Sequence, residues 1–92
     1  MIIRILGAGQ YQVDDRHLDE LNALDDRLNT AVQAGDLAAF HAELTALVEA
    51  IRAAGTPVPD DALTPSDLVV PDQDADLAQV QALLRDDGLI PG

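Results

Sequence analysis

The 92-residue chain contains no cysteine and no tryptophan, and it has only one phenylalanine and one tyrosine. Without cysteine there is no disulfide framework and no thiolate metal site. Because aromatic side chains are so scarce, the core must be built from Leu, Val and Ile packed over Ala, which favours close contacts between helices. A chain of this length forms a single domain, residues 1–92, with no room for a second core.

Positive charge is equally scarce, since five arginines and no lysine stand against 17 acidic residues, for a net charge of −12. Such a surface repels nucleic acid phosphates and anionic lipid headgroups, which disfavours direct binding to DNA, RNA or a bare membrane. The opening stretch MIIRIL is too short for a signal peptide or a membrane span. We therefore expect a cytoplasmic protein that does not insert into a membrane.

The first eleven residues, MIIRILGAGQY, raise the question of a phosphate-binding loop. A dinucleotide fingerprint needs a third glycine three residues after the second and a helix that opens directly from the loop. Here the third position is Gln12, within an alternating run, Gln10–Val13, that favours a strand. Gly7-Ala8-Gly9 therefore predicts a tight turn between this strand and the β-branched run Ile2–Leu6.

Two long amphipathic helices are predicted next, because apolar residues recur at steps of three and four over residues 18–32 and 37–51. Gly35 is expected to end the first helix in a left-handed conformation, and Asp36 to cap the second. Gly55, with a proline shortly behind it, ends the second helix. A connection this short makes the two helices an antiparallel αα-hairpin.

The remainder of the chain predicts smaller elements. The stretch TPVPDDALTPSD, residues 56–67, predicts an irregular crossing, and Leu68–Val70 is a candidate third strand. Asp74 is expected to cap a short helix that Gly88 ends. We therefore predict an α+β fold in which the αα-hairpin and the short C-terminal helix pack on a small antiparallel sheet. The alternative is a helical bundle with the N-terminal hairpin apart.

No constellation of residues predicts catalysis. His17 and His41 fall near opposite ends of the predicted hairpin, so a shared metal site is not expected. The pairs Asp25–Asp26 and Asp86–Asp87 stand among polar neighbours and predict solvated faces. The acidic stretch 72–76 lacks the glycine and glutamate of a calcium loop and suits helix capping. We expect no enzyme activity, no cofactor and no metal.

A resemblance to a known family is carried by four stretches: MIIRILGAGQYQV, LDELNALDDRL with AGD, GTPVPDDALTPSDLVVP, and ALLRDDGLIPG. Together they resemble the PspA-associated protein family (PspAA), small domains encoded beside or fused to phage-shock-protein-A homologues in actinobacteria and some archaea. The resemblance spans essentially the whole chain. It implies a non-catalytic interaction module for a PspA-type coiled-coil protein that remodels membranes in the envelope stress response.

The same resemblance implies recruitment to the inner face of the membrane through that partner. The family has no established catalytic residues, so it transfers none to this chain. A small-ligand-sensing regulatory domain, with a pocket between sheet and helices, is the alternative function, and a homo-oligomer is left open.

The partner-binding surface is predicted at the sheet edge and the chain ends, because the apolar helix faces are needed for the core. Gln10–Val13 as an edge strand would offer unpaired backbone groups, and tyrosine is enriched in binding hot spots. The alternative is that Tyr11 packs on the sheet and the C-terminal residues seal the fold. The candidate residues are Gln10, Tyr11, Leu89, Ile90 and Pro91.

Overall fold

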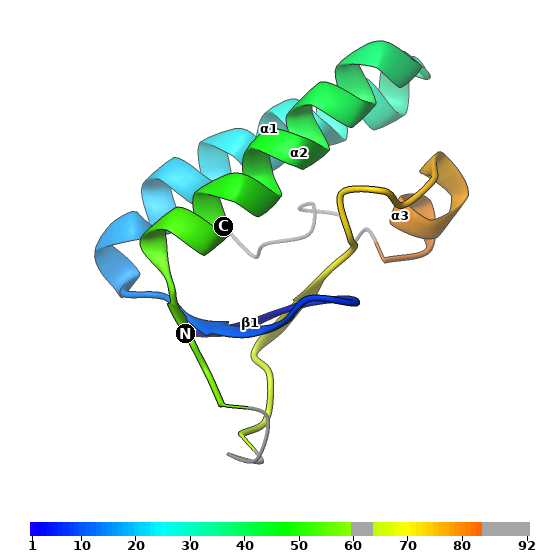
Figure 1. Cartoon of the computed structure of the whole chain (residues 1–92). Coiled ribbons are helices and arrows are strands. Elements are labelled where there is room, and N and C mark those ends of the chain that lie inside the picture. The colour runs from blue at the N-terminus through cyan, green and yellow to red at the C-terminus, as the bar shows by residue number, and fades with distance from the viewer. Residues whose placement is uncertain (60–63, 84–92) are drawn as a thin grey trace.

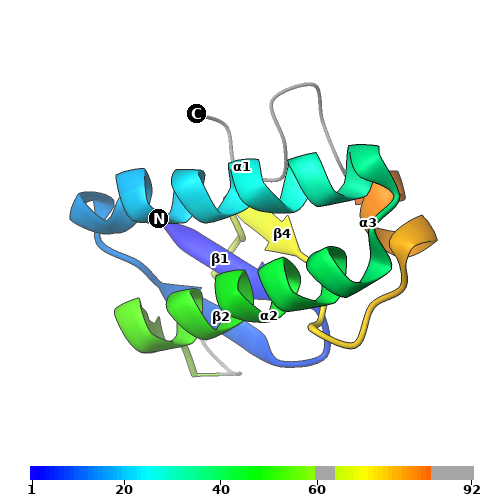
Figure 2. The ribbon, with the colours of Figure 1, turned by 90° about the horizontal axis from the view of Figure 1, so that it is seen from above.

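The computed structural model describes residues 1–59 and 64–83, which form two layers. The elements in chain order are β1 (Ile2–Ile5), β2 (Gly9–Gln12), the 3-10 turn η1 (Asp15–His17), α1 (Leu18–Ala34), α2 (Leu37–Ala54), β3 (Thr56–Pro57), β4 (Leu68–Val70) and α3 (Leu77–Leu83). Helices α1 and α2 lie antiparallel and side by side on one face of the sheet (Figures 1 and 2). The predicted α+β class and αα-hairpin are confirmed.

The sheet has four strands in the order β3-β2-β1-β4. β2 pairs with β1 in antiparallel fashion, and β3 pairs with the outer side of β2 in the same way. β4 is the predicted third strand, and it lies on the other side of β1. The expectation of an antiparallel sheet is wrong for β4, which runs parallel to β1, and the short strand β3 was not foreseen.

The direction of β4 is fixed by contacts at the start of β1. The Asp67 amide donates to the Ile2 carbonyl at 2.8 Å, and the Ile2 amide donates to the Asp67 carboxylate at 2.8 Å. These two bonds hold the beginning of β4 against the beginning of β1. From Ile2 and from Asp67 the chain continues toward the same end of the sheet, so β1 and β4 run in parallel.

The turn between β1 and β2 has the geometry that the glycines allow. Gly7 and Gly9 have φ angles of +81° and +91°, which residues with a Cβ rarely adopt. The Ala8 amide donates to the Ile5 carbonyl at 2.9 Å. The chain then enters β2 directly, so the interpretation of this segment as a tight turn is confirmed.

Local signals also set the ends of the helices. Gly35 ends α1 with a φ of +67°, and the Asp36 side chain accepts a hydrogen bond from the Ala39 amide at 3.1 Å, as predicted. The predicted cap of α3 was wrong, because Asp76 takes the role assigned to Asp74. The Asp76 carboxylate accepts from the Gln79 amide at 2.8 Å, and the Gln79 side chain accepts from the Asp76 amide at 2.9 Å. Gly88 lies outside the described residues.

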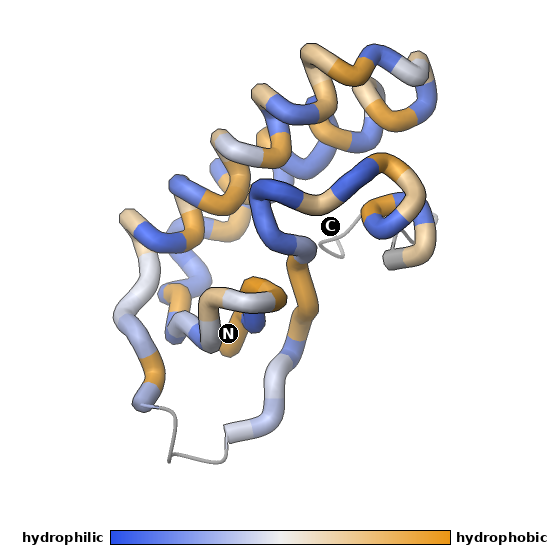
Figure 3. The backbone as a smooth tube through the Cα atoms, turned by 45° about the vertical axis from the view of Figure 1, so that its right-hand side comes forward, coloured by the Kyte–Doolittle hydropathy of each residue, from blue (hydrophilic) through white to orange (hydrophobic). Residues whose placement is uncertain are grey.

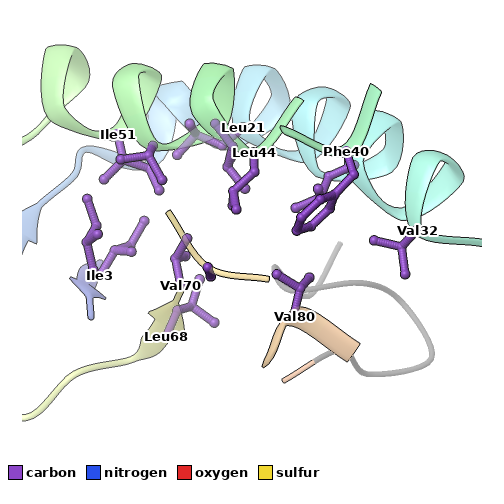
Figure 4. Packing of buried hydrophobic residues seen from close by; sticks show 14 of the residues in the cluster. Ile3, Leu21, Val32, Phe40, Leu44, Ile51, Leu68, Val70 and Val80 are labelled. Atoms are coloured by element: carbon purple, nitrogen blue, oxygen red, sulfur yellow. The ribbon is translucent and has the colours of Figure 1, made fainter. Parts of the chain in front are cut away.

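The helices are longer than the sheet that they cover. The 17 residues of α1 span about 26 Å, whereas the four residues of β1 span about 13 Å. Short helix α3 lies under the turn of the hairpin, beyond the sheet (Figure 2). There Val80 faces Phe40 and Val32, so α3 completes the core that the sheet begins (Figure 4).

The buried core is aliphatic apart from one ring, as the composition predicted. Both strands of the parallel pair, β1 and β4, and both long helices contribute fully or nearly buried side chains. Its larger members are Ile3, Ile5, Val13, Leu21, Leu28, Phe40, Leu44, Leu47, Val48, Ile51, Leu68, Val70 and Val80.

We predict that added salt stabilises the domain. A net charge of −12 makes the compact state repel itself, and raising the ionic strength from about 0.1 M to 1 M shortens the reach of these charges from about 10 Å to about 3 Å. Urea midpoints should therefore rise with sodium chloride. Neutralising exposed charges on α1, in Asp19→Asn and Asp26→Asn together, should reduce that dependence. Midpoints that stay flat or fall would contradict the prediction.

Candidate protein-interaction site

A hollow lies where the parallel strands β1 and β4 end. It is a groove of about 440 Å³, here called the Leu6 groove. Leu6 follows β1, Pro71 follows β4, and α3 closes the opposite side. Its described lining consists of Leu6, Pro71, Asp72, Asp74, Ala75, Gln79 and Ala82.

The position of Leu6 follows from the turn beside it. Its amide donates to the Val70 carbonyl at 3.0 Å, so its backbone is held in line with β4. Successive side chains of a strand point to opposite faces, so Leu6, like Arg4, follows a buried isoleucine on the side away from the core. The Leu6 side chain is 43% exposed, and Gly7 then reverses the chain.

The other wall of the groove is the link between β4 and α3. Pro71 ends the strand, because it has no amide hydrogen to continue a ladder. The Asp72 carbonyl accepts from the Ala75 amide at 2.9 Å, which turns the chain and places buried Ala75 toward the core. Figure 3 shows the run of hydrophilic positions in this link. The described lining thus combines apolar residues, here called the floor (Leu6, Pro71, Ala75 and Ala82), with the carboxylates of Asp72 and Asp74, here called the rim.

The candidate residue Gln10 has a structural role. Its side-chain amide donates to the Thr64 carbonyl and to the Ser66 hydroxyl, both at 2.7 Å. These bonds hold residues 64–66 against β2, across more than fifty positions of sequence. The sequence offered no signal for them, because a strand glutamine has no preferred distant partner.

Replacing Gln10 with alanine should loosen this segment without unfolding the domain. Two net hydrogen bonds are worth about 1–3 kcal/mol together. Backbone amides of residues 66–68 should exchange with deuterium faster, while those of α1 and α2 keep their protection. Gln12→Ala is the matched control, because Gln12 is exposed and its side chain makes one long contact, 3.5 Å from the Met1 carbonyl. Equal exchange in both variants would contradict the role assigned to Gln10.

The candidate residue Tyr11 does not lie on a free edge. β3 covers that side of β2, with Tyr11 opposite Pro57, so the prediction of an edge strand at Gln10–Val13 is wrong. The Tyr11 side chain is half-buried and packs against the core, as the alternative interpretation held. The edge strands are β3 and β4. Leu89, Ile90 and Pro91 lie outside the described residues, so their role stays a prediction.

The comparison with known families shows to which protein family the chain belongs. The family model described as PspA-associated protein matches residues 1–92, the whole chain. The chain belongs to the PspA-associated protein family. No curated protein and no solved structure matches the chain.

A second hollow of this PspA-associated domain lies beside the turn of the helical hairpin. It has a volume of about 380 Å³ and is lined by Arg27, Thr30, Ala31, Ala34, Asp36, Ala39 and Glu43. Charges of both signs line this second hollow, so its charge favours neither a basic nor an acidic partner. The space between the sheet and the long helices, where the alternative function would place a ligand pocket, is occupied by fully buried side chains.

The acidic pairs behave differently from the prediction. Asp26 is exposed, but Asp25 is only 1% exposed, so the expectation of a solvated pair is wrong for Asp25. Asp25 lies four residues after Leu21 and three before Leu28, which puts it beside the apolar stripe of α1. One turn earlier, the side-chain oxygen of Asn22 is buried and has no hydrogen-bond partner among the described residues. Asp86 and Asp87 lie outside the described residues.

Neither histidine of the PspA-associated domain belongs to the described lining of the Leu6 groove. His17 precedes α1, and His41 lies exposed on α2 with its ring 5.0 Å from that of Phe40. Within residues 1–59 and 64–83, no three His, Asp or Glu side chains gather as metal ligands do. In the same part of the chain, every helix is too short or too polar to cross a bilayer.

Proposed function

We propose that this domain is a non-catalytic interaction module for a PspA-type protein, acting in the envelope stress response. The family match over residues 1–92 supports an association with PspA, as the family description states. The observation that carries an interaction role is the exposure of Leu6 in the apolar part of the groove lining. A large aliphatic side chain at such a position is stabilised when a partner removes it from water.

The charge of the domain supports the same proposal. A net charge of −12 opposes direct contact with anionic lipids, so the domain would reach the membrane through its partner. The described lining of the Leu6 groove contains neither histidine nor a hydroxyl side chain, and it suits packing and charge pairing. We place this activity in the cytoplasm, at the inner face of the membrane.

Co-purification with a PspA homologue from the same genome tests this function. The tagged domain, co-expressed with that homologue, should retain it through affinity and size-exclusion steps at micromolar concentration. The control is an unrelated acidic protein of similar size and charge with the same tag, which should not retain the homologue. Separate elution of the two proteins would contradict the proposed function.

A ligand-sensing role is the second candidate, and the size of the Leu6 groove favours it. Its volume of about 440 Å³ falls within the range of about 300–1,000 Å³ typical of small-molecule sites. Screening small cationic and apolar compounds by NMR tests this role. Saturable shifts confined to the amides of Leu6, Ala75 and Gln79 would support it, whereas an absence of such shifts across the screen would count against it.

A further inference from the structure

We propose that the Leu6 groove binds a basic amphipathic segment of the PspA-type partner. In this complex an apolar side chain of the partner packs on Leu6, and lysine or arginine side chains pair with Asp72 and Asp74. The inference rests on the proposed function and deepens it, because it names the surface and the chemistry of the bound segment.

The apolar part of the proposal comes from the floor of the groove. Leu6, Val69 and Leu37 are the large apolar residues that the described chain leaves exposed, and Leu6 alone of the three lines the groove. Its neighbours Pro71, Ala75 and Ala82 are small, so they leave room for an inserted side chain. The hydrogen bond from the Leu6 amide to Val70 fixes the floor before binding, which lowers the entropy lost on association.

The basic part comes from the rim. Asp72 and Asp74 line the groove, and neither makes an ion pair in the described part of the chain. No arginine belongs to the described lining. Two carboxylates beside an apolar floor favour a segment that presents apolar and basic side chains on the same face. The net charge of −12 attracts such a segment toward the domain before it binds.

The same charges disfavour other occupants. A second copy of the chain, docked groove to groove about a two-fold axis, would bring Asp72 and Asp74 of one copy against those of the other. Like charges brought together in an interface act against that pairing. Phosphate-bearing occupants, such as nucleic acids or anionic headgroups, meet the same repulsion.

Calorimetric titration of the full-length PspA homologue into the domain tests the proposal with two groove variants. Leu6→Ser should weaken binding about tenfold, the loss of about 1.4 kcal/mol of apolar contact. The double variant Asp72→Asn, Asp74→Asn should weaken binding at low salt and flatten its dependence on sodium chloride. Thermal melts of each variant establish that it remains folded.

Matched controls separate the groove from general effects of polarity and charge. Leu37→Ser removes an apolar side chain that is 56% exposed on α2 and does not belong to the described lining of the groove. Asp19→Asn with Glu20→Gln removes two exposed charges from the first turn of α1. Both controls should bind within about twofold of the wild type, and the second should keep more of the salt dependence than the rim variant.

The outcomes distinguish this inference from the proposed function. If the wild type does not bind the homologue, the proposed function fails. If the wild type binds and both folded groove variants bind equally well, the function stands and the groove is the wrong surface. If the rim variant keeps the full salt dependence, the segment is not recognised by its basic charge. If Leu6→Ser abolishes self-association of the wild type in sedimentation, a second copy occupies the groove and the proposal is overturned.

Discussion

Leu47→Asp should abolish cooperative folding of the domain. Leu47 lies on α2 in the centre of the core and is fully buried. An unpaired carboxylate at such a site costs several kcal/mol, against a total stability of about 5–10 kcal/mol for a domain of this size. Circular dichroism at 222 nm, followed during heating, should lose the sigmoidal transition of the wild type.

The position of the substitution, rather than the added charge, should decide the result. Leu37→Asp on the same helix adds the same charge at a side chain that is 56% exposed, and it should change the melting temperature by only a few degrees. Leu24→Asp should lie between the two, because Leu24 is half-buried and its carboxylate can reach water. A cooperative transition in Leu47→Asp within a few degrees of the wild type would contradict the assignment of the core.

Gly55→Ala should destabilise the domain by about 1–3 kcal/mol through overpacking. A Cβ at Gly55 would lie 2.8 Å from the Ile51 carbonyl oxygen and 2.9 Å from the Tyr11 Cβ. Neither atom is the end of a flexible side chain, so the end of α2 would have to move away from β2. The φ angle of −94° is ordinary, which makes space, not backbone conformation, the cause. The measurement is the urea midpoint.

Gly35 provides the matched comparison, because its constraint is of the opposite kind. A Cβ there would meet nothing within 4 Å, but its φ is +67°. Asparagine tolerates this left-handed region better than alanine. At position 35 the variant with asparagine should therefore be more stable than that with alanine, and at position 55 the order should reverse. The same order at both sites would show that space does not limit residue 55.

The sequence by itself determined the local parts of this protein. The apolar spacing at steps of three and four residues placed both long helices, and Gly35, Asp36 and the Gly7–Gly9 turn acted where they were expected. These features depend on hydrogen bonds and conformational preferences within a few consecutive residues, so the sequence carries them directly. The family resemblance, which rests on four such stretches, is confirmed over the whole chain.

Only the tertiary structure decided which distant segments meet. Asp67 binds Ile2 across 65 positions, and this contact makes β4 parallel to β1. That parallel pairing brings the ends of both strands together, so Leu6, Asp72 and Asp74 line one groove. The sequence indicated Leu6 only as the end of a strand, and the two aspartates only as helix-capping acids. Such contacts depend on the packing of the whole domain, and no window of neighbouring residues specifies them.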